Sequence, residues 1–454
     1  MGEPPARGIR RVLSILRDEL ARLEQTPIPS RWRHHGFVRA CDGGLVTASG
    51  LPAPIGTLCR IADGDRQTAA EIVGFRDGLT LMMLLGDPTH LRPGLRVYAD
   101  GEAGLVEVGE AFLGRAVDAL GQPIDGGPAI RARRWWPLDG RRESALQRAS
   151  VTEPFDCGIR AINALTTLGV GQRTGIVAGS GVGKSVLIDM IADGAQCDVA
   201  VVALIGERAR EVSDFVSRHM QGSRRTRTVV VAVPADHAAN LRLRGARYAT
   251  AMAESFRAQG RRVLLIMDSL TRVAHAAREI GLVLGEPAAA RGYPPSALAA
   301  ITGLVERAGN ARNSGGAITG LYTVLADGDD HNDPVVDTAR AILDGHIVLS
   351  RALAMRGQYP AIDVPASLSR VMGGITATEH GELARRFRAL AADYEANRDL
   401  VLMGAYRPGA DKRVDQAMAM HEALADFVRQ RSGEVCTLSE SLAGLSAVLA
   451  DDLG

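Results

Sequence analysis

One glycine-rich stretch carries residue types that could hold a chain of phosphates. Residues 175–185 read Gly-Ile-Val-Ala-Gly-Ser-Gly-Val-Gly-Lys-Ser, with Ala178 where the strict phosphate-loop pattern has its first glycine. The apolar run 174–178 predicts a buried strand, and the apolar spacing after Ser185 predicts a helix. Glycines let successive N–H groups turn inward toward an anion, and the helix N-terminus adds its positive end. The stretch therefore predicts a nucleoside triphosphate site, against the alternative of a glycine-rich helix entry that binds nothing.

Two side chains of this loop have expected roles. Lys184 would reach the β- and γ-phosphates, and the Ser185 hydroxyl would hold Mg²⁺. We therefore expect a nucleoside triphosphate and Mg²⁺ as cofactors. The remaining residues expected to contact the nucleotide are Gly179, Ser180, Gly181, Val182, Gly183 and Val186.

Two acidic residues follow apolar runs that predict buried strands. Asp268 follows the run 263–267, where a Walker B aspartate holds Mg²⁺ through its water shell. Glu207 follows the run 199–205 and could polarise a water against the γ-phosphate. The plainer alternatives are that Asp268 caps a helix and that Glu207 pairs with a nearby arginine.

The sequence around these residues predicts a wound α/β domain. The runs 199–205, 228–233 and 263–267 are continuously apolar, as in strands of a parallel sheet covered on both faces. Helical patterns at 207–219 and 240–259 separate these strands and would cover the sheet.

The N-terminal quarter differs from this middle region. Residues 8–24 place an apolar stripe on one face of a predicted helix, which needs a partner, a membrane surface or the protein's own surface. From 36 to 101, turn pairs recur between short strand-like runs and predict a small β-barrel or β-sandwich. Aromatic residues are sparse in this barrel, so we expect a structural collar rather than a single-strand nucleic-acid site.

Composition and charge limit the class of protein and its cellular compartment. The 454 residues carry a net charge of +1, which gives no global field for binding nucleic acid. The five cysteines are scattered and odd in number, which favours free thiols in a reducing compartment. No apolar run reaches the roughly 18 residues of a membrane span, and the first residues lack a signal-peptide core. We expect a cytoplasmic protein.

Several longer motifs carry a family resemblance. They are Gly-Glu-Arg-Ala-Arg-Glu at 206–211, Met-Asp-Ser-Leu-Thr-Arg at 267–272, Gly-Tyr-Pro-Pro-Ser at 292–296, Leu-Val-Glu-Arg-Ala-Gly-Asn at 304–310, the stretch 341–351 and Tyr-Pro-Ala-Ile-Asp at 359–363. The chain resembles the hexameric ATPases of type III protein export, which are relatives of the catalytic subunit of rotary ATP synthases. The resemblance spans about residues 36 to 430, and the stretches 271–278 and 397–406 are most similar to flagellar export ATPases.

The resemblance implies a domain order and further site residues. Glu207 would activate the attacking water and Arg208 would lie near metal and phosphate. Tyr359 would stack on adenine, Tyr406 would close the other side of the ring, and Arg370 would be an arginine finger for the neighbouring subunit. The implied domains are an amphipathic helix at 1–28, a β-barrel at 29–104, a RecA-like P-loop ATPase core at 105–372 and a C-terminal helical domain at 373–454.

The implied function is ATP hydrolysis by a homohexamer that unfolds and delivers export substrates. Implied partners are a stator-like regulator at the first helix, a central coiled-coil stalk, export-gate membrane proteins and chaperone–cargo complexes, but no nucleic acid. The acidic loop 327–333 would face the stalk, or be a solvated turn. The chain would work in the cytoplasm, peripherally associated with the inner membrane. Alternatives are a virulence secretion ATPase, a rotary ATP synthase subunit, a non-hydrolysing regulatory subunit and a ring-shaped RNA translocase.

Overall fold

A computed structural model describes residues 35–86, 89–100, 104–141, 144–219, 223–325 and 333–450. The chain divides into two compact units, residues 1–103 and residues 104–454. The predicted helix within residues 1–28 and the acidic residues 327–332 lie outside the described ranges. Asp333, the last residue of the predicted acidic loop, is described and caps the helix that follows it.

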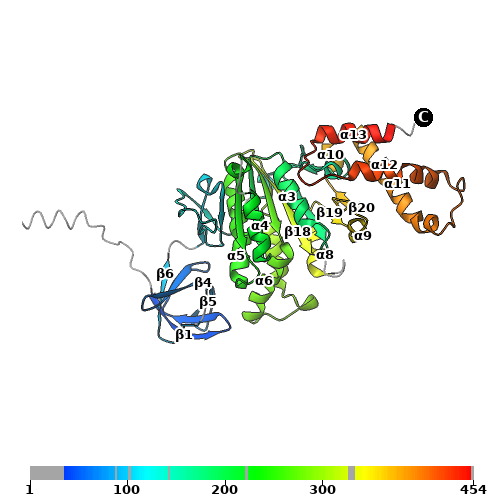
Figure 1. Cartoon of the computed structure of the whole chain (residues 1–454). Helices are drawn as coiled ribbons and strands as arrows, with labels where there is room; N and C mark the ends of the chain where they lie inside the picture. The colour runs from blue at the N-terminus through cyan, green and yellow to red at the C-terminus, as the bar shows by residue number, and fades with distance from the viewer. Residues whose placement is uncertain are drawn as a thin grey trace, which may run out of the picture. The chain divides into compact units, whose positions relative to one another are not determined.

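The first unit is a closed antiparallel barrel, as the recurring turn pairs predicted (Figure 1). The strands pair in the order β1-β2-β5-β4-β3-β6. Alternate apolar side chains such as Val46, Ile61 and Met82 fill its interior. The strands are β1 (His35–Asp42), β2 (Leu45–Ser49), β3 (Leu58–Asp63), β4 (Arg66–Arg76), β5 (Leu79–Leu84) and β6 (Arg96–Asp100).

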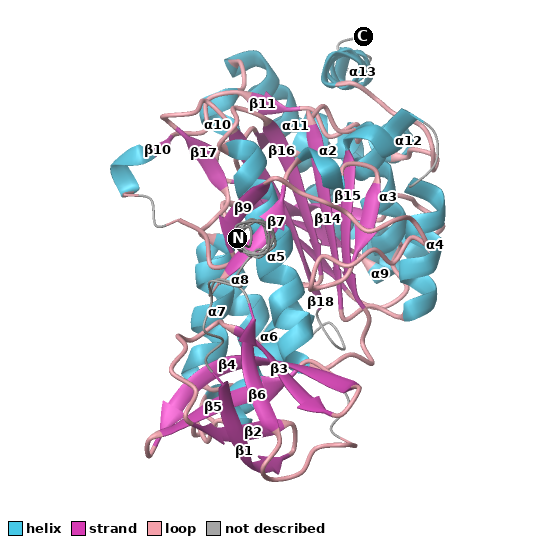
Figure 2. Cartoon of the chain, turned by 90° about the vertical axis from the view of Figure 1, so that its left-hand side faces the viewer, coloured by secondary structure: helices cyan, strands magenta, loops and turns pink. Residues whose placement is uncertain are grey.

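The second unit is built on one large sheet, visible at the centre of Figure 2. Its main path runs β20-β19-β13-β18-β16-β14-β15-β8, parallel throughout except for the edge strand β20. The predicted α/β core is confirmed. The strands are β8 (Arg115–Val117), β13 (Arg173–Ala178), β14 (Val199–Ile205), β15 (Thr228–Val233), β16 (Arg262–Asp268), β18 (Ala317–Leu325), β19 (Gly345–Leu349) and β20 (Ile362–Ser369).

Helices cover both faces of this sheet, and the strand sequences explain why. Along β14, Val201 and Ala203 pack with α5, α6, α7 and α8, whereas Val202 and Leu204 pack with α2, α3 and α4. Because successive side chains point to opposite faces, a continuously apolar strand needs both layers. The helices are α2 (Arg160–Leu165), α3 (Lys184–Gly194), α4 (Ala209–His219), α5 (Ala239–Arg257), α6 (Leu270–Val283), α7 (Pro295–Val305), α8 (Pro334–Ile342) and α9 (Arg351–Met355).

The last helices are α10 (Met372–Ile375), α11 (Thr378–Leu402), α12 (Lys412–Val428) and α13 (Leu438–Ala450). Phe387, Leu424 and Leu445 from this group share an apolar cluster with Leu165 of α2, and all four are buried. The predicted domain boundary near residue 372 thus falls between β20 and α11, while the helices after it lie in the same compact unit as the sheet.

Short elements complete the second unit. They are β7 (Leu105–Val108), β9 (Arg134–Pro137), β10 (Arg148–Ala149), β11 (Pro154–Phe155), β12 (Leu168–Gly169), β17 (Gly309–Ala311) and the 3₁₀ turns η1 (Glu110–Phe112), η2 (Ala145–Gln147), η3 (Ser223–Arg227) and η4 (Ala290–Gly292). Among the helices of the described ranges, none is both long enough and apolar enough to cross a membrane.

Candidate active site

The glycine-rich loop lies between β13 and α3, at the carboxyl end of the parallel strands. Gly181 and Gly183 have φ angles of 76° and 92°, a backbone region that favours glycine. A Cβ atom on Gly183 would also lie only 3.3 Å from the ring of Tyr359. The loop therefore needs glycine at residue 183 both for its turn and for the close approach of an aromatic ring.

Three charged side chains predicted from the sequence meet beside this loop. Lys184 Nζ lies 3.3 Å from Glu207 Oε1 and forms a close ion pair with Asp268 Oδ1. These side chains are between 6% and 12% exposed, so solvent screens them weakly. Strands β13, β14 and β16 end at the same edge of the sheet, which is why residues far apart in the sequence converge here.

The electrostatics follow from burial and close charges. Burial lowers the pKa of the Lys184 ammonium, but the negative charges of Asp268 and Glu207 outweigh burial and leave that pKa raised. Burial also raises the pKa of the Asp268 carboxyl, an effect that the charge of Lys184 offsets in part. One ammonium thus faces two carboxylates, and a cation would relieve their mutual repulsion.

Thr323 of β18 is a site residue that the sequence reasoning missed. Its buried Oγ1 donates to Asp268 Oδ1 at 2.6 Å and also lies 3.3 Å from the Met267 carbonyl oxygen. Strand β18 lies between β13 and β16, so Thr323 stands between the phosphate loop and the strand that carries Asp268. A threonine inside an apolar run gives no local signal for this role, because the contact depends on strand order.

Ser185 and Asp268, the predicted Mg²⁺ ligands, line one cavity of about 340 Å³ together with Glu207. The hydroxyl and carboxylate oxygens of this cavity are the hard donors that Mg²⁺ prefers. Across the described ranges, no group of three or more His, Cys, Asp or Glu side chains is arranged to hold a metal ion. Ser185 and Asp268 therefore fit a Mg²⁺ ion that takes its other ligands from the phosphate oxygens of the nucleotide.

A second cavity, of about 700 Å³, opens on the other side of α3. Tyr359 and Val186, both predicted to contact the nucleotide, line it, as does Gly183. Residues from the segment 429–434, which lies between α12 and α13, also line it. The cavity therefore offers an aromatic ring and a second lining segment directly beside the phosphate loop, as a nucleotide base requires.

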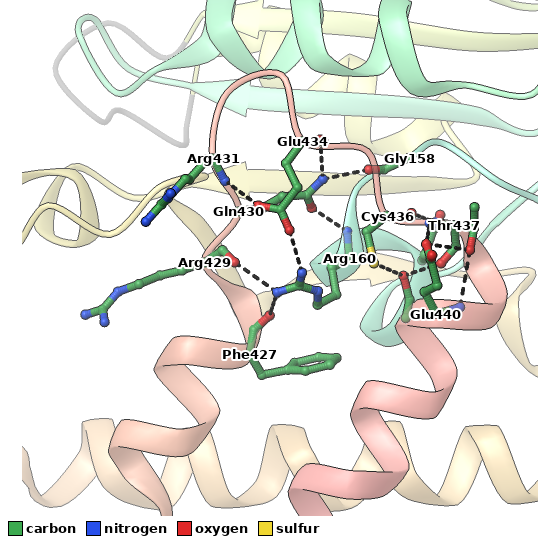
Figure 3. Close-up of polar contacts among 12 residues, drawn as sticks. Gly158, Arg160, Phe427, Arg429, Gln430, Arg431, Glu434, Cys436, Thr437 and Glu440 are labelled. Atoms are coloured by element: carbon green, nitrogen blue, oxygen red, sulfur yellow. Dashed lines mark hydrogen bonds and ion pairs between the residues drawn. The ribbon is translucent and has the colours of Figure 1, made fainter.

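The segment 429–434 is held by a hydrogen-bond network around Arg160 and Gln430 (Figure 3). Gln430 Nε2 donates to the carbonyl oxygens of Gly158 and Glu434, each at 2.8 Å, and its Oε1 accepts from the Arg160 amide at 2.8 Å. The Arg160 guanidinium donates to Glu434 Oε1 at 2.8 Å and to the carbonyl oxygens of Phe427 and Arg429. The backbone N–H of Gln430 donates to the Tyr359 carbonyl oxygen at 3.0 Å, so it links the segment 429–434 to Tyr359.

Two predicted residues are not brought to these cavities. Arg208 is 85% exposed and pairs with Glu211 at 3.4 Å, away from Lys184. Tyr406 follows α11, where its hydroxyl bonds to Asp411 and Asp415, and it is not among the residues that line the cavity beside Tyr359. The wall that Tyr406 was predicted to supply is formed by 429–434, a segment without an aromatic residue and hence without a sequence signal.

Arg370 lies at the opposite end of the sheet from the phosphate loop. Its backbone follows β20, where Ser369 pairs with Gly345, while Ile362 at the other end pairs with Leu349 and so aligns with Ala178. Both ends of β20 pair with the five-residue strand β19, so they lie about 13 Å apart at about 3.3 Å per residue. The exposed Arg370 side chain, bonded to the Arg340 carbonyl at 3.1 Å, thus lies at the end of the sheet that is away from Lys184.

Comparison with known proteins agrees with this geometry. Residues 158–369 match the nucleotide-binding domain of the ATP synthase alpha/beta family, and residues 376–447 match the C-terminal domain of the type III secretion ATPase EscN. A flagellum-specific ATP synthase of Pseudomonas aeruginosa is 45% identical, over 94% of this chain and 96% of its own length. A type 3 secretion system ATPase of Xanthomonas euvesicatoria is 43% identical, over 92% and 95%.

Solved structures give the same result. The assembled ATPase EscN in complex with its central stalk EscO, from the type III secretion system of enteropathogenic E. coli, is 37% identical and superimposes with a TM-score of 0.84. That alignment covers 91% of this chain and 100% of the other. The chain belongs to the family of flagellum-specific ATP synthases and type 3 secretion system ATPases.

Proposed function

We propose that this chain hydrolyses ATP and that a homohexameric ring of it uses the energy to unfold and deliver flagellar export substrates. The observation that carries the proposal is the buried cluster of Lys184, Glu207 and Asp268 beside the phosphate loop. A chain that only bound nucleotide would need Lys184, but it would have no use for a buried glutamate held 3.3 Å from that lysine.

The residues suit an in-line hydrolysis. Lys184 would exchange its contacts with Asp268 and Glu207 for phosphate oxygens, which frees the Glu207 carboxylate to accept a proton from water. The water oxygen would bond to the γ-phosphorus as the bond to the bridging β,γ-oxygen breaks, giving ADP and phosphate. Mg²⁺, held through Ser185 and Asp268, would supply charge neutralisation, and Thr323 would keep Asp268 oriented. Arg208, exposed and paired with Glu211 here, would have to turn toward the phosphates to act.

Residues that bind the adenine base and an arginine finger complete the proposed site. Tyr359 would stack on adenine, with the segment 429–434 lining the same cavity and Tyr406 as a further contact if its loop moves. Arg370 would act on the γ-phosphate of a neighbouring subunit, because its own phosphate loop lies at the other end of the sheet. A ring of subunits meets this requirement, and the EscN relative is described as an assembled ATPase.

The proposed partners follow from the family. A central coiled-coil stalk would bind the ring, since the EscN relative is described in complex with its central stalk EscO. A stator-like regulator would bind the first helix, and export-gate membrane proteins and chaperone–cargo complexes would meet the assembly at the cytoplasmic face of the inner membrane. A virulence secretion system is the second candidate, because the Xanthomonas euvesicatoria relative has nearly the same identity as the flagellar one.

Replacement in the native cell tests this proposal. In a strain that lacks its own copy, the wild-type chain should restore secretion of flagellar subunits, whereas Lys184→Ala, made at the same level, should not. Restored secretion of virulence effectors alone would favour the second candidate. If deletion of the gene changes neither the secretion of flagellar subunits nor that of virulence effectors, the proposed role in export is wrong.

A further inference from the structure

The backbone next to Arg370 is joined to β19 over a short stretch. The pairing of β20 with β19 shifts register, and two residue pairs face each other at the end that leads to Arg370. The pairs are Gly345 with Ser369 and His346 with Leu368. Beyond them, the Arg370 N–H donates to the carbonyl oxygen of Asp344 at 2.9 Å. The position of Arg370 therefore depends on how Ser369 and the Asp344 carbonyl are held.

The side chain of Gln172 contacts both of these groups. Its Nε2 donates to the Asp344 carbonyl oxygen at 3.1 Å and lies 3.2 Å from Ser369 Oγ. The Asp344 carbonyl thus accepts from the Arg370 N–H and from the Gln172 amide at the same time. Because Gln172 is fully buried and Ser369 is only 8% exposed, bulk water cannot readily replace these contacts.

The partners of Gln172 also fix the orientation of its amide. Its Oε1 accepts from the Gly169 N–H at 2.8 Å, whereas its Nε2 faces the Asp344 carbonyl oxygen. Because the amide oxygen only accepts and the amide nitrogen only donates, a flipped side chain would lose both bonds. A Cβ atom on Gly345 would lie 3.1 Å from Nε2, so the amide packs directly against the backbone pair that precedes Arg370.

Gln172 lies far from the phosphate loop of its own chain. It directly precedes β13, whose six residues end at Ala178, where the loop begins. At about 3.3 Å per residue, the two ends of β13 lie about 17 Å apart. A change in Gln172 should therefore leave Lys184 in place while it disturbs Arg370.

We propose that Gln172 is a positioning residue for Arg370, whose amide fixes Ser369 and the Asp344 carbonyl so that the guanidinium reaches the γ-phosphate of the neighbouring subunit. This inference rests on the proposed function, in which Arg370 is an arginine finger. Gln172 touches no reacting atom, so it acts through the backbone that carries Arg370. Misplacement of a catalytic group by about 1 Å can cost about 100-fold in rate, so loss of this support should be visible in turnover.

Gln172→Met tests the inference, because methionine has a similar length but no amide. In the full-length protein, we expect kcat for ATP to fall about tenfold or more, while the ATP dissociation constant stays within about twofold of wild type. Thr319→Val is the matched control. Thr319 is also buried, and its hydroxyl accepts from the Gly171 N–H at 3.0 Å, in the turn that leads to Gln172. This control should keep kcat near wild type.

Mixed rings distinguish a misplaced finger from damage to the variant's own nucleotide site. With Lys184→Ala, the Gln172→Met subunit supplies an intact Lys184 and its neighbour supplies a well-placed Arg370, so activity should exceed the mean of the two parents. With Arg370→Ala, no interface gains a well-placed finger, so activity should not exceed that mean. Damage to the variant's own nucleotide site would give the reverse pattern. Ring formation and subunit exchange are verified by native mass determination in both mixtures.

Recovery with Arg370→Ala, no recovery with Lys184→Ala, an unchanged kcat in Gln172→Met or an equal loss in Thr319→Val would overturn the inference. If Gln172→Met does not fold, Ser369→Ala, which removes one of the two contacts, should lower kcat about threefold with the same pattern in mixed rings. An unchanged kcat in Ser369→Ala would then overturn the inference. Near-normal ATPase activity of Arg370→Ala would instead contradict the proposed finger, and a wild-type protein without ATPase activity would contradict the proposed function.

Discussion

Lys184 and Arg370 stand at opposite ends of the same sheet. Lys184 opens α3 at the carboxyl end of β13, and Arg370 follows β20 beside the residue that precedes β19, at the other end of these strands. An arginine that assists phosphoryl transfer must reach the γ-phosphate, and within one chain this distance is too long. The arrangement is explained if each complete site takes Lys184 from one subunit and Arg370 from the next.

Mixing two inactive variants tests the shared site. Lys184→Ala and Arg370→Ala should each lose most ATPase activity, because an arginine finger is worth about 10³–10⁵-fold in other phosphoryl-transfer enzymes. In mixed rings, an interface that combines the intact Lys184 of one subunit with the intact Arg370 of its neighbour is complete. Activity should therefore recover in part on mixing and rise with total protein concentration.

Ring formation and subunit exchange serve as the control for that experiment, measured by native mass determination. Verified mixed rings that remain as inactive as either parent would show that Arg370 does not act across the interface. Recovery without exchange would point to contamination and not to a shared site.

Tyr359 should determine affinity for the base. Its ring lies against Gly183 and lines the cavity beside the phosphate loop, although the side chain is 47% exposed. Loss of one base–aromatic stack typically costs about 1–3 kcal/mol, so Tyr359→Ala should raise KM for ATP about fivefold to 100-fold with little change in kcat. Tyr359→Phe is the matched control and should behave like wild type. Equal KM values for Tyr359→Ala and Tyr359→Phe would place the base elsewhere.

Thr323 should affect turnover rather than nucleotide affinity. Thr323→Val keeps the shape of the side chain but removes the hydrogen bond to Asp268, and a bond to a charged group is worth about 1.5–3 kcal/mol. We expect kcat to fall about tenfold and Thr323→Ser to restore most of it. Thr319→Val, on the same strand, removes a bond to the Gly171 amide and should leave kcat unchanged. A similar loss in both valine variants would mean that the effect is on the sheet as a whole.

The parts of the site that sequence could predict are those with local signals. The glycine-rich turn, Lys184 and Ser185 form one contiguous motif, and Asp268 and Glu207 each directly follow an apolar run. Parallel strands bring their carboxyl ends together, so these residues converge once the sheet is assumed. The barrel was predictable for a similar reason, because its turn residues recur at short spacing.

The rest depended on contacts between distant segments. Thr323 and Gln430 act through partners on other elements, and nothing in their own neighbourhood distinguishes them from ordinary polar residues. The resemblance predicts that Tyr406 contacts the base, whereas in this structure its hydroxyl bonds within its own loop and residues 429–434 line the cavity beside Tyr359. A sequence motif also does not show which way a side chain points, as the exposed Arg208 illustrates.

ATP binding and turnover by Glu207→Gln, measured on the same preparation, test whether Glu207 is the general base of ATP hydrolysis. Glutamine keeps the size of the side chain but cannot take a proton from water, and Lys184, Ser185 and the backbone of the loop remain to hold the phosphates. We expect an ATP dissociation constant within a few-fold of wild type and a kcat lower by about 10²–10⁴-fold. Near-normal steady-state hydrolysis by Glu207→Gln would contradict it.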